Sequence, residues 1–308
     1  MKKISLRVMT ADAGLRLDKF LAARSGLSRT TCRKTLGEGG VFLGRRRATR
    51  LSRPVAAGET YVLVFAARPT LAAEPRVLYE DDGLLAVDKP AGLPTEGTLW
   101  SARATALAWA ERHAGAPVFS VHRLDAVTSG VLVIAKTHAA ARRMAESFRV
   151  GAAVKTYLAA VALGAAGLPG ADGSIDGRLA RAATPGRFEV VRQGGVPATT
   201  DWRTLAQGPG AALLAVRPRT GRTHQIRVHL AHLGAPILGD IRYGGPRVLA
   251  LPAWGNLPLA RPLLHASRIE LPHPEGGRIL QVQAPLPADF VELMRVFGWS
   301  PSLADAAS

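Results

Sequence analysis

An apolar run that begins directly after a charged cluster restricts the fold of this chain more than any other feature. The run, at residues 131–135, holds only aliphatic residues and alanine, which predicts a strand buried on both faces. The segment before it, HRLDAVTSG at residues 122–130, carries a histidine, an arginine and an aspartate. Because Thr128-Ser129-Gly130 predicts a turn, we expect Asp125 on a short loop at the edge of a rigid sheet, where catalytic groups are often found.

An aspartate that lies against a buried strand needs a cation to stay ionised, because low-dielectric surroundings favour the neutral acid. Arg123 is the nearest candidate in the sequence, and more distant arginines are the others. Two interpretations stay open from these residues alone. Asp125 is catalytic, or Arg123 and Asp125 form an ion pair that only fastens the loop.

The segments around this cluster combine strands with single helices, without strict alternation. The expected strands and helices are listed by residue number: strands at 77–79, 84–87, 131–135, 155–161 and 213–217, and helices at 105–114, 139–148 and 223–233. The first two strands flank Asp81-Asp82-Gly83, which predicts a hairpin. This pattern favours an α+β fold with a mixed, largely antiparallel central sheet and flanking helices.

Charge is concentrated at the N-terminal end of the chain. The net charge is +17, and the first 68 residues contain 15 lysines and arginines against 4 acidic residues. Such an excess predicts a polyanionic partner, with nucleic acid first and an acidic membrane surface second. A generally basic, solvated surface is the alternative.

Cysteine content and hydropathy restrict the cellular context. The single cysteine, Cys32, excludes an intramolecular disulfide and a multi-cysteine zinc site. No apolar segment follows the N-terminal lysines as in a signal peptide, and glycines and Pro169 interrupt the longest uncharged run, at residues 156–171. We expect a cytoplasmic protein.

The basic head contains two expected helices, which end at Gly26 and near Gly37, and strands at residues 41–43 and 61–65. Ser28 is the expected N-cap of the second helix. The arginines and lysine that we expect to contact RNA phosphates lie on this helix or in the loop after it: Arg29, Arg33, Lys34, Arg45, Arg46 and Arg47. A solvated charged face is the alternative for them.

The head resembles the S-four (alpha-L) RNA-binding domain over about residues 14–65. RLDKFL at residues 16–21 and SRTTCR at residues 28–33 carry this resemblance. The chain departs from the pattern at Phe42-Leu43-Gly44, where the family usually has a valine-asparagine-glycine turn. The resemblance implies a small α/β RNA-binding domain ahead of the larger body.

The body resembles the RluA-type pseudouridine synthases through three segments in the expected order. They are HRLDAVTSG (residues 122–130), VKTYLAAV (154–161) and RTGRTHQIRVHLAHLGAPILGDIRYG (219–244). The resemblance implies the pseudouridine synthase fold and a division into an RNA-binding domain at 1–65, a linker at 66–75, a catalytic domain at 76–297 and a tail at 298–308. It also implies that the enzyme needs no cofactor.

Site residues follow from the resemblance. The motif positions of the family's catalytic aspartate, tyrosine and arginine are Asp125, Tyr157 and Arg227. Arg123 matches the arginine that fills the space of an extruded nucleotide. Other motif residues are expected to contact substrate or RNA: His122, Thr128, His224 and Gln225.

Two positions depart from the family pattern. Asp88 replaces a common asparagine, and Val196 replaces a common lysine, which removes a backbone contact to the substrate. The histidines do not indicate a metal site, because His224 and His229 lie on different sides of the expected helix.

The implied chemistry breaks the glycosidic C–N bond of uridine and remakes the base–sugar link through carbon 5 of the same base. A carboxylate stabilises electron-poor sugar states by covalent addition or by removing a ribose proton, and both pathways stay open for Asp125. The nucleotide must be flipped out of its stack. We expect a monomeric enzyme that modifies structured RNA, with large-subunit ribosomal RNA favoured over transfer RNA. A non-catalytic RNA-binding or ribosome-assembly factor and a small-molecule glycosidase or nucleosidase are the alternatives.

Overall fold

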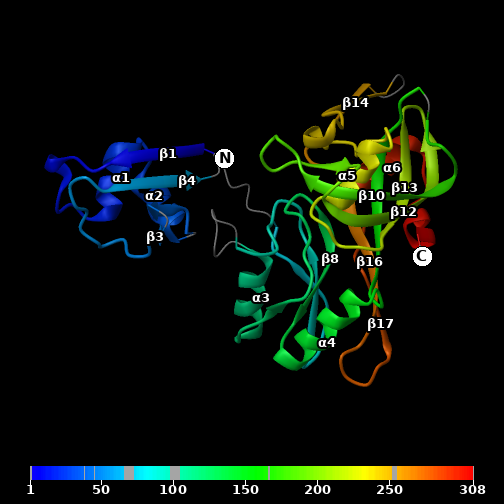
Figure 1. Cartoon of the computed structure of the whole chain (residues 1–308), viewed down its shortest axis with the longest axis horizontal. Helices are drawn as coiled ribbons and strands as arrows, with labels where there is room; N and C mark the ends of the chain where they lie inside the picture. Colours follow the sequence, from blue (N-terminus) through cyan, green and yellow to red (C-terminus); the bar gives the residue numbers. More distant parts are fainter. Residues whose placement is uncertain are drawn as a thin grey trace. The chain divides into compact units, whose positions relative to one another are not determined.

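The computed structural model describes residues 2–37, 39–44, 46–65, 73–97, 105–165, 167–251 and 255–307 (Figure 1). Contacts group the chain into two compact units, one made of Met1–Ala73 and Leu93–Gly115 and the other of Glu74–Gly92 and Ala116–Ser308. Most of the expected linker, residues 66–72, lies outside the described ranges, so the domain boundaries stay predictions. No helix in the described ranges is long and apolar enough to cross a membrane.

The N-terminal unit contains a four-stranded sheet in the order β1-β4-β2-β3. Its elements are β1 (Lys2–Arg7), a short 3-10 helix (Thr10–Asp12), α1 (Leu17–Ser25), α2 (Arg29–Gly37), β2 (Val41–Leu43), β3 (Arg46–Arg47), β4 (Thr60–Phe65) and α3 (Ala106–Ala114). Helix α1 ends at Gly26, and the Ser28 hydroxyl accepts a hydrogen bond from the Thr31 amide at 3.1 Å, as expected.

One expectation for this unit is wrong. Arg46 and Arg47 were expected in a loop, but they form β3 because they pair with Leu43 and Phe42 of β2 across a tight turn at Gly44. Strand β1 was not expected at all. Its residues are paired along β4, which supplies the backbone partners that its short, partly charged sequence does not predict.

The larger unit is built on one sheet of eleven strands. Along the main path the order is β11-β10-β12-β13-β9-β16-β8-β6-β5, with β17 paired to β16 and β7 paired to β8. The strands are β5 (Arg76–Glu80), β6 (Leu84–Lys89), β7 (Phe119–Ser120), β8 (Ser129–Ala135), β9 (Val154–Ala162), β10 (Asp172–Arg181), β11 (Phe188–Val191), β12 (Val196–Gly208), β13 (Ala211–Pro218), β16 (Leu264–Pro272) and β17 (Ile279–Gln283). Only β16 and β8 pair in parallel among the described strands, which confirms the expected mixed, largely antiparallel sheet.

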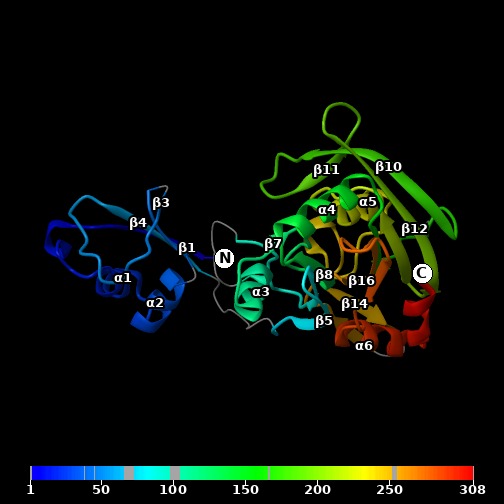
Figure 2. The same cartoon turned by 90° about the horizontal axis from the view of Figure 1, so that it is seen from below.

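Helices cover this sheet at two places, seen in Figures 1 and 2. Helix α4 (His138–Arg149) buries Ala140 and Met144 against β6 and β8, and α6 (Ala288–Phe297) buries Phe290 and Leu293 against β9 and β13. The remaining elements are α5 (Gln225–His232), a 3-10 helix at Ile241–Tyr243, a small β14–β15 ribbon (Val248–Leu251 and Gly255–Pro258) and a final 3-10 helix (Pro301–Ala307).

The buried residues explain why β8 is the rigid centre of the larger unit. All seven of its residues are buried, and it pairs with β6, β7 and β16. The expected strand at residues 131–135 is therefore confirmed. Asp125 lies just before this strand.

Candidate active site

Asp125 lies in the loop between β7 and β8. The Thr128 amide donates to the Asp125 carbonyl at 3.0 Å, so the turn covers residues 125–128. The expected turn at Thr128-Ser129-Gly130 is wrong in its position, because Ser129 and Gly130 already pair with β16. Asp125 is thus inside the turn, with its side chain 18% exposed.

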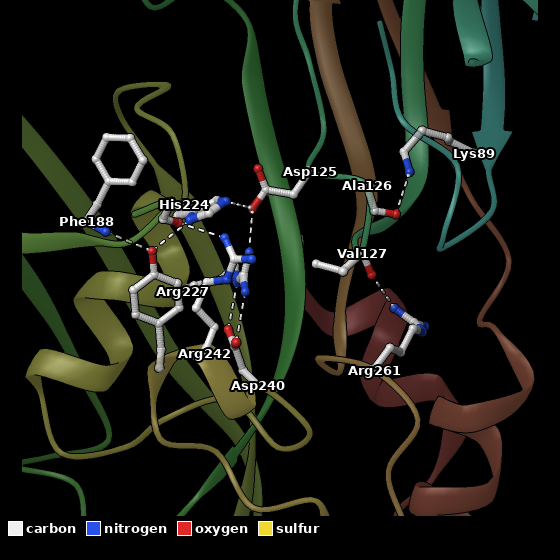
Figure 3. Close-up of polar contacts among 12 residues, drawn as sticks. Lys89, Asp125, Ala126, Val127, Phe188, His224, Arg227, Asp240, Arg242 and Arg261 are labelled. Atoms are coloured by element: carbon white, nitrogen blue, oxygen red, sulfur yellow. Dashed lines mark hydrogen bonds and ion pairs between the residues drawn. The ribbon is translucent and has the colours of Figure 1, made fainter. Parts of the chain in front are cut away.

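Three residues from two other segments bind backbone carbonyls of this turn, and Figure 3 shows two of them, Lys89 and Arg261. The Gly92 amide donates to the Ala126 carbonyl at 2.7 Å, and the Lys89 ammonium reaches the same carbonyl at 3.5 Å. The Arg261 guanidinium donates to the Val127 carbonyl at 3.4 Å. The two residues after Asp125 are therefore held by partners far away in the sequence.

Gly130 allows β8 to approach β16 closely at the end of the turn. Its φ is 110°, and a Cβ atom at this position would lie 2.1 Å from the carbonyl oxygen of Ala266. No other residue type fits this contact without moving a strand. Gly130 is therefore required for the close packing of β8 against β16, independently of any role in catalysis.

Arg227 is the cation beside Asp125. It lies on α5, its side chain is 6% exposed, and its Nη1 atom donates to Asp125 Oδ2 at 3.2 Å. Its Nε and Nη2 atoms donate to the two carboxylate oxygens of the fully buried Asp240 at 2.6 and 2.8 Å. The guanidinium thus joins two carboxylates, and Arg123 is not the partner of Asp125.

A small aromatic cluster surrounds the other side of this arginine. The Arg227 guanidinium lies 5.0 Å from the centre of the Tyr243 ring, a cation–π distance. The Tyr243 hydroxyl lies 2.7 Å from Nδ1 of His224. Nε2 of His224 lies 3.8 Å from Asp125 Oδ2 (Figure 3). Burial lowers the pKa of His224, although the charge of Asp125 opposes this change.

Tyr157 on β9 is 8% exposed and lines the same cleft as Asp125 and Arg227. Burial raises the pKa of its phenol, and the negative charge of Asp125 raises it further. The phenol is therefore protonated at neutral pH. The three residues that carry the expected chemistry share one cavity.

The cleft has a volume of about 560 Å³ and opens between the Asp125 turn, β9 and the start of α5. All the expected body residues line it: His122, Arg123, Asp125, Thr128, Tyr157, His224, Gln225 and Arg227. Basic side chains that were not expected also line it: Lys155, Arg217, Arg219 and Arg222. The surplus of positive charge suits a phosphate-bearing substrate.

Some of the expected contact residues are committed to the protein itself. Both side-chain polar atoms of Gln225 are used, because its Nε2 donates to the Thr199 carbonyl at 2.8 Å and its Oε1 accepts from the Arg222 amide at 3.0 Å. His122 Nε2 accepts from the Val133 amide at 2.9 Å, and burial lowers the pKa of His122 to about 3. These two residues hold α5 and the turn in place.

The basic residues expected to bind RNA in the head divide into two groups. The guanidiniums of Arg29 and Arg33 donate to the buried carboxylate of Asp18, as does that of Arg16, which was not among the expected contacts, and all three remain nearly half exposed. Lys34 and Arg46 are exposed, and Arg47 lies 5.9 Å from the Phe42 ring. Arg45 lies outside the described residues.

Two polar residues near the site were missed by sequence reasoning, Asp240 and Tyr243. Both occur in the segment GDIRYG at residues 239–244, where a single acid stands between glycines after an apolar stretch. An acid beside an apolar stretch indicates a buried ion pair. The sequence does not show, however, that its partner is Arg227, 13 residues earlier. Within the described residues, no group of three histidines, cysteines or acids is placed to hold a metal ion.

Comparison with known proteins agrees with this architecture. The sequence profile of a family described as RNA pseudouridylate synthase matches residues 83–232. A Haemophilus influenzae protein named ribosomal large subunit pseudouridine synthase D is 32% identical, over 94% of this chain and 94% of that protein. A Nitrosomonas europaea protein of the same name is 37% identical, over 71% of this chain and 64% of that protein.

A solved structure gives the same result at the level of the fold. The structure of human RNA pseudouridylate synthase domain containing 4 aligns with a TM-score of 0.59 and 28% identity, over 72% of this chain and 93% of that one. The fold and the similarity together define the class as enzymes that isomerise uridine to pseudouridine. The chain belongs to the RNA pseudouridine synthase family, and the resemblance to its RluA-type members is confirmed.

Proposed function

We propose that this pseudouridine synthase acts on large-subunit ribosomal RNA and that Asp125, Tyr157 and Arg227 are its catalytic residues. The observation that carries the proposal is the 3.2 Å contact between Arg227 and Asp125 in a basic cleft that Tyr157 also lines. The names of the relatives from Haemophilus and Nitrosomonas support the choice of ribosomal RNA. The cytoplasmic location and the monomeric state stay predictions.

Asp125 supplies the carboxylate that the sugar meets. The glycosidic bond to the base nitrogen breaks, the uracil turns, and a bond forms from the sugar to carbon 5, which then loses its proton. The sugar carbon is electron-poor between these steps, and a carboxylate beside it stabilises that state. The reaction has no redox step and transfers no group to a second molecule, so these residues suffice for it.

Arg227 pairs with Asp125 and orients its carboxylate. Its Nη1 atom contributes positive charge to Asp125 Oδ2, and Asp240 fixes the plane of the guanidinium through two hydrogen bonds. In this proposal Tyr157 provides a flat, buried face for the uracil ring, and its phenol takes part in removing the proton of carbon 5.

Arg123 and the basic side chains of the cleft hold the RNA. Extruding a uridine costs a few kcal/mol of stacking, and the exposed Arg123, two residues before Asp125, replaces the lost stacking partner. The head at residues 1–65 adds phosphate contacts through its arginines. Val196, exposed at the start of β12, takes no part in the chemistry.

Mapping of pseudouridine in total RNA tests the substrate. RNA from cells with and without the gene is treated so that pseudouridine stops primer extension. We expect a stop in large-subunit ribosomal RNA to disappear with the gene. A stop lost only from transfer RNA would assign the enzyme to that substrate, and no lost stop would favour a non-catalytic ribosome-assembly factor.

A further inference from the structure

We infer that His224 is a positioning residue which, together with Arg227, occupies one oxygen of Asp125 and leaves the other oxygen, Oδ1, to act on the sugar. The inference rests on the proposed catalytic role of Asp125. Sequence reasoning placed His224 among the RNA contacts. Its surroundings assign it a role toward the carboxylate.

The hydrogen bonds of Tyr243 fix the tautomer of His224. The Phe188 amide has one hydrogen and donates it to the Tyr243 oxygen at 3.1 Å. Tyr243 is 6% exposed, so its own hydroxyl hydrogen needs a protein acceptor. Among the described residues this acceptor is Nδ1 of His224, 2.7 Å away. The neutral imidazole therefore carries its hydrogen on Nε2.

The Nε2–H group faces Asp125. The distance from Nε2 to Asp125 Oδ2 is 3.8 Å, and Arg227 Nη1 approaches the same oxygen at 3.2 Å. In Figure 3 both dashed lines end on one carboxylate oxygen of Asp125. Within the described residues, Oδ1 has no hydrogen-bond partner. Arg227 thus hydrogen-bonds Oδ2, whereas the His224 Nε2–H group lies beyond hydrogen-bond distance in this structure and attracts the same oxygen as a dipole, which leaves Oδ1 free.

The backbone keeps the imidazole in this position. His224 is the only described residue other than glycine with a positive φ, 57°, and it directly precedes α5. This conformation is unfavourable for a histidine and persists only where the surroundings determine it. The next residue, Gln225, is hydrogen-bonded to Thr199 and Thr200 of β12, which fixes the start of the helix.

The groups around His224 favour its neutral form. Phe188 of β11 and Tyr243 contact its ring edge-on, with ring centres 5.6 Å away in each case. Asp125 and Asp240 raise its pKa, whereas Arg227 and Arg242 lower it, and burial lowers it most. The net pKa is below the ordinary value, so the neutral Nε2–H tautomer is present at neutral pH.

A neutral donor suits this position better than a cation. A second full positive charge on Oδ2 would stabilise the resting carboxylate further and weaken its action on the sugar. A neutral N–H restricts rotation of the carboxylate at a smaller electrostatic cost to reactivity. Arg227 then supplies the positive charge beside Asp125, and His224 restricts the orientation of the Asp125 carboxylate.

Nuclear magnetic resonance of the full-length protein tests the tautomer without any need for activity. Histidine nitrogens are isotopically labelled, and the His224 signal is assigned by its loss in His224→Asn. We expect Nε2 protonated and Nδ1 unprotonated at about pH 7. Tyr243→Phe keeps the aromatic ring at position 243 but lacks the hydroxyl. In this variant we expect the His224 imidazole to take up its second proton at a higher pH than in the wild type. A wild-type proton on Nδ1 would overturn the inference.

Two substitutions at position 224 test the role in catalysis. Asparagine tolerates a positive φ but is too short to reach Asp125, whereas the glutamine amide can replace the Nε2–H donor. We expect His224→Asn to lower kcat by about tenfold or more with little change in KM, and His224→Gln to restore part of this loss. Thermal unfolding of both variants provides the control for folding.

The outcomes separate this inference from the proposed function. If the wild type modifies RNA but both variants keep its kcat, His224 has no positioning role and the function of Asp125 stands. If a loss of kcat is equal in both variants, the donor is not the cause and the inference fails. If the wild type forms no pseudouridine, the proposed function fails, while the resonance experiment still decides the tautomer.

Discussion

Asp240 and Arg227 form a bidentate pair in which the acid is fully buried and the arginine is 6% exposed. This pair uses two nitrogens of the guanidinium and directs the third, Nη1, toward Asp125. Asp240 therefore orients the cation that orients the catalytic acid. Asp240 should therefore affect kcat although it acts only through Arg227.

Replacement of Asp240 by asparagine tests this relationship. Asp240→Asn leaves a buried guanidinium without its full counter-charge, which costs about 3–5 kcal/mol of the free energy of unfolding. We also expect kcat to fall by about 10- to 100-fold, the range found when a residue behind a functional group is removed. Denaturant unfolding and single-turnover kinetics measure the two effects.

The matched control is Glu292→Gln, which removes the exposed Glu292–Arg295 pair of α6. This change should alter the free energy of unfolding by less than about 1 kcal/mol and leave kcat at the wild-type value. Wild-type kcat in Asp240→Asn would show that Arg227 is oriented by other contacts.

The head contains a second acid that organises arginines. Burial alone would raise the pKa of Asp18, but hydrogen bonds from Arg29, Arg16 and Arg33 lower it to about 2. Asp18→Asn removes a negative charge, so general electrostatics predicts tighter RNA binding. We expect weaker binding, by a few-fold, because the three guanidiniums lose their common anchor. Fluorescence anisotropy with a ribosomal RNA fragment measures the Kd.

Asp12→Asn is the control for this prediction. Asp12 lies in the same unit and has a similarly buried carboxylate, but Arg24 is the one arginine that it binds among the described residues, beside the Met9 amide. Asp12→Asn should leave the Kd for the RNA fragment unchanged or lower it slightly. Equal Kd values for the two variants would contradict an organising role of Asp18.

A second cleft of about 640 Å³ shares Arg227 with the walls of the first and is also lined by Asp240. Arg187, Arg242 and Arg247 line it and are exposed. We predict that the RNA strand continues across this second cleft. Arg187→Ala and Arg247→Ala should each raise KM and reduce the slope of log KM against log salt by about one.

Arg149→Ala is the control for the second cleft, because Arg149 is exposed on α4 and does not line either cleft. It should change neither KM nor the salt dependence beyond a small amount. An unchanged salt slope in the cleft variants, equal to that of Arg149→Ala, would mean that RNA does not contact these arginines.

Lys89 makes stability depend on pH. Burial lowers the pKa of this fully buried lysine to about 7, although the charge of Asp125 opposes the change. Between about pH 7 and pH 10 the unfolded chain binds a proton that the folded chain lacks, so the contribution of Lys89 to stability rises with pH. Lys89→Met should therefore stabilise the protein more at about pH 7 than at pH 9.5.

Denaturant unfolding of the wild type and of Lys89→Met at both pH values measures this difference, in which the other titrating groups largely cancel. A difference that is independent of pH would contradict the low pKa of Lys89. The hydrogen bonds from Lys89 to the carbonyls of Pro90 and Ala126 explain why a lysine is placed there.

Local patterns in the sequence predicted the elements that carry the site. The strand at residues 131–135, the helix capped by Thr137 and the helix after His224 were all expected, because apolar period and capping residues are local signals. Strands β10 to β12 were not expected. Their residues alternate irregularly, and their structure is decided by the pairing of β12 with β13, of β10 with β12 and of β11 with β10.

The site was predictable from motifs but not from chemistry alone. Asp125 was recognisable as an acid beside a buried strand, yet its cation, Arg227, lies 102 residues later. Asp240, Tyr243 and the tautomer of His224 depend on contacts that only the folded chain creates. The turn at residues 125–128 was misplaced because Ser129 and Gly130 favour turns locally but are drawn into β8 by β16.

Loss of the hydrogen at carbon 5 of uracil measures the central claim most directly. RNA labelled with tritium at that carbon is incubated with the wild type and with Asp125→Asn, and released tritium is counted beside pseudouridine by mass spectrometry. The wild type should release tritium in step with pseudouridine formation, and Asp125→Asn should release none while it still binds the RNA and unfolds at the wild-type temperature. Continued release by a folded Asp125→Asn would contradict the assignment of Asp125 as the catalytic acid.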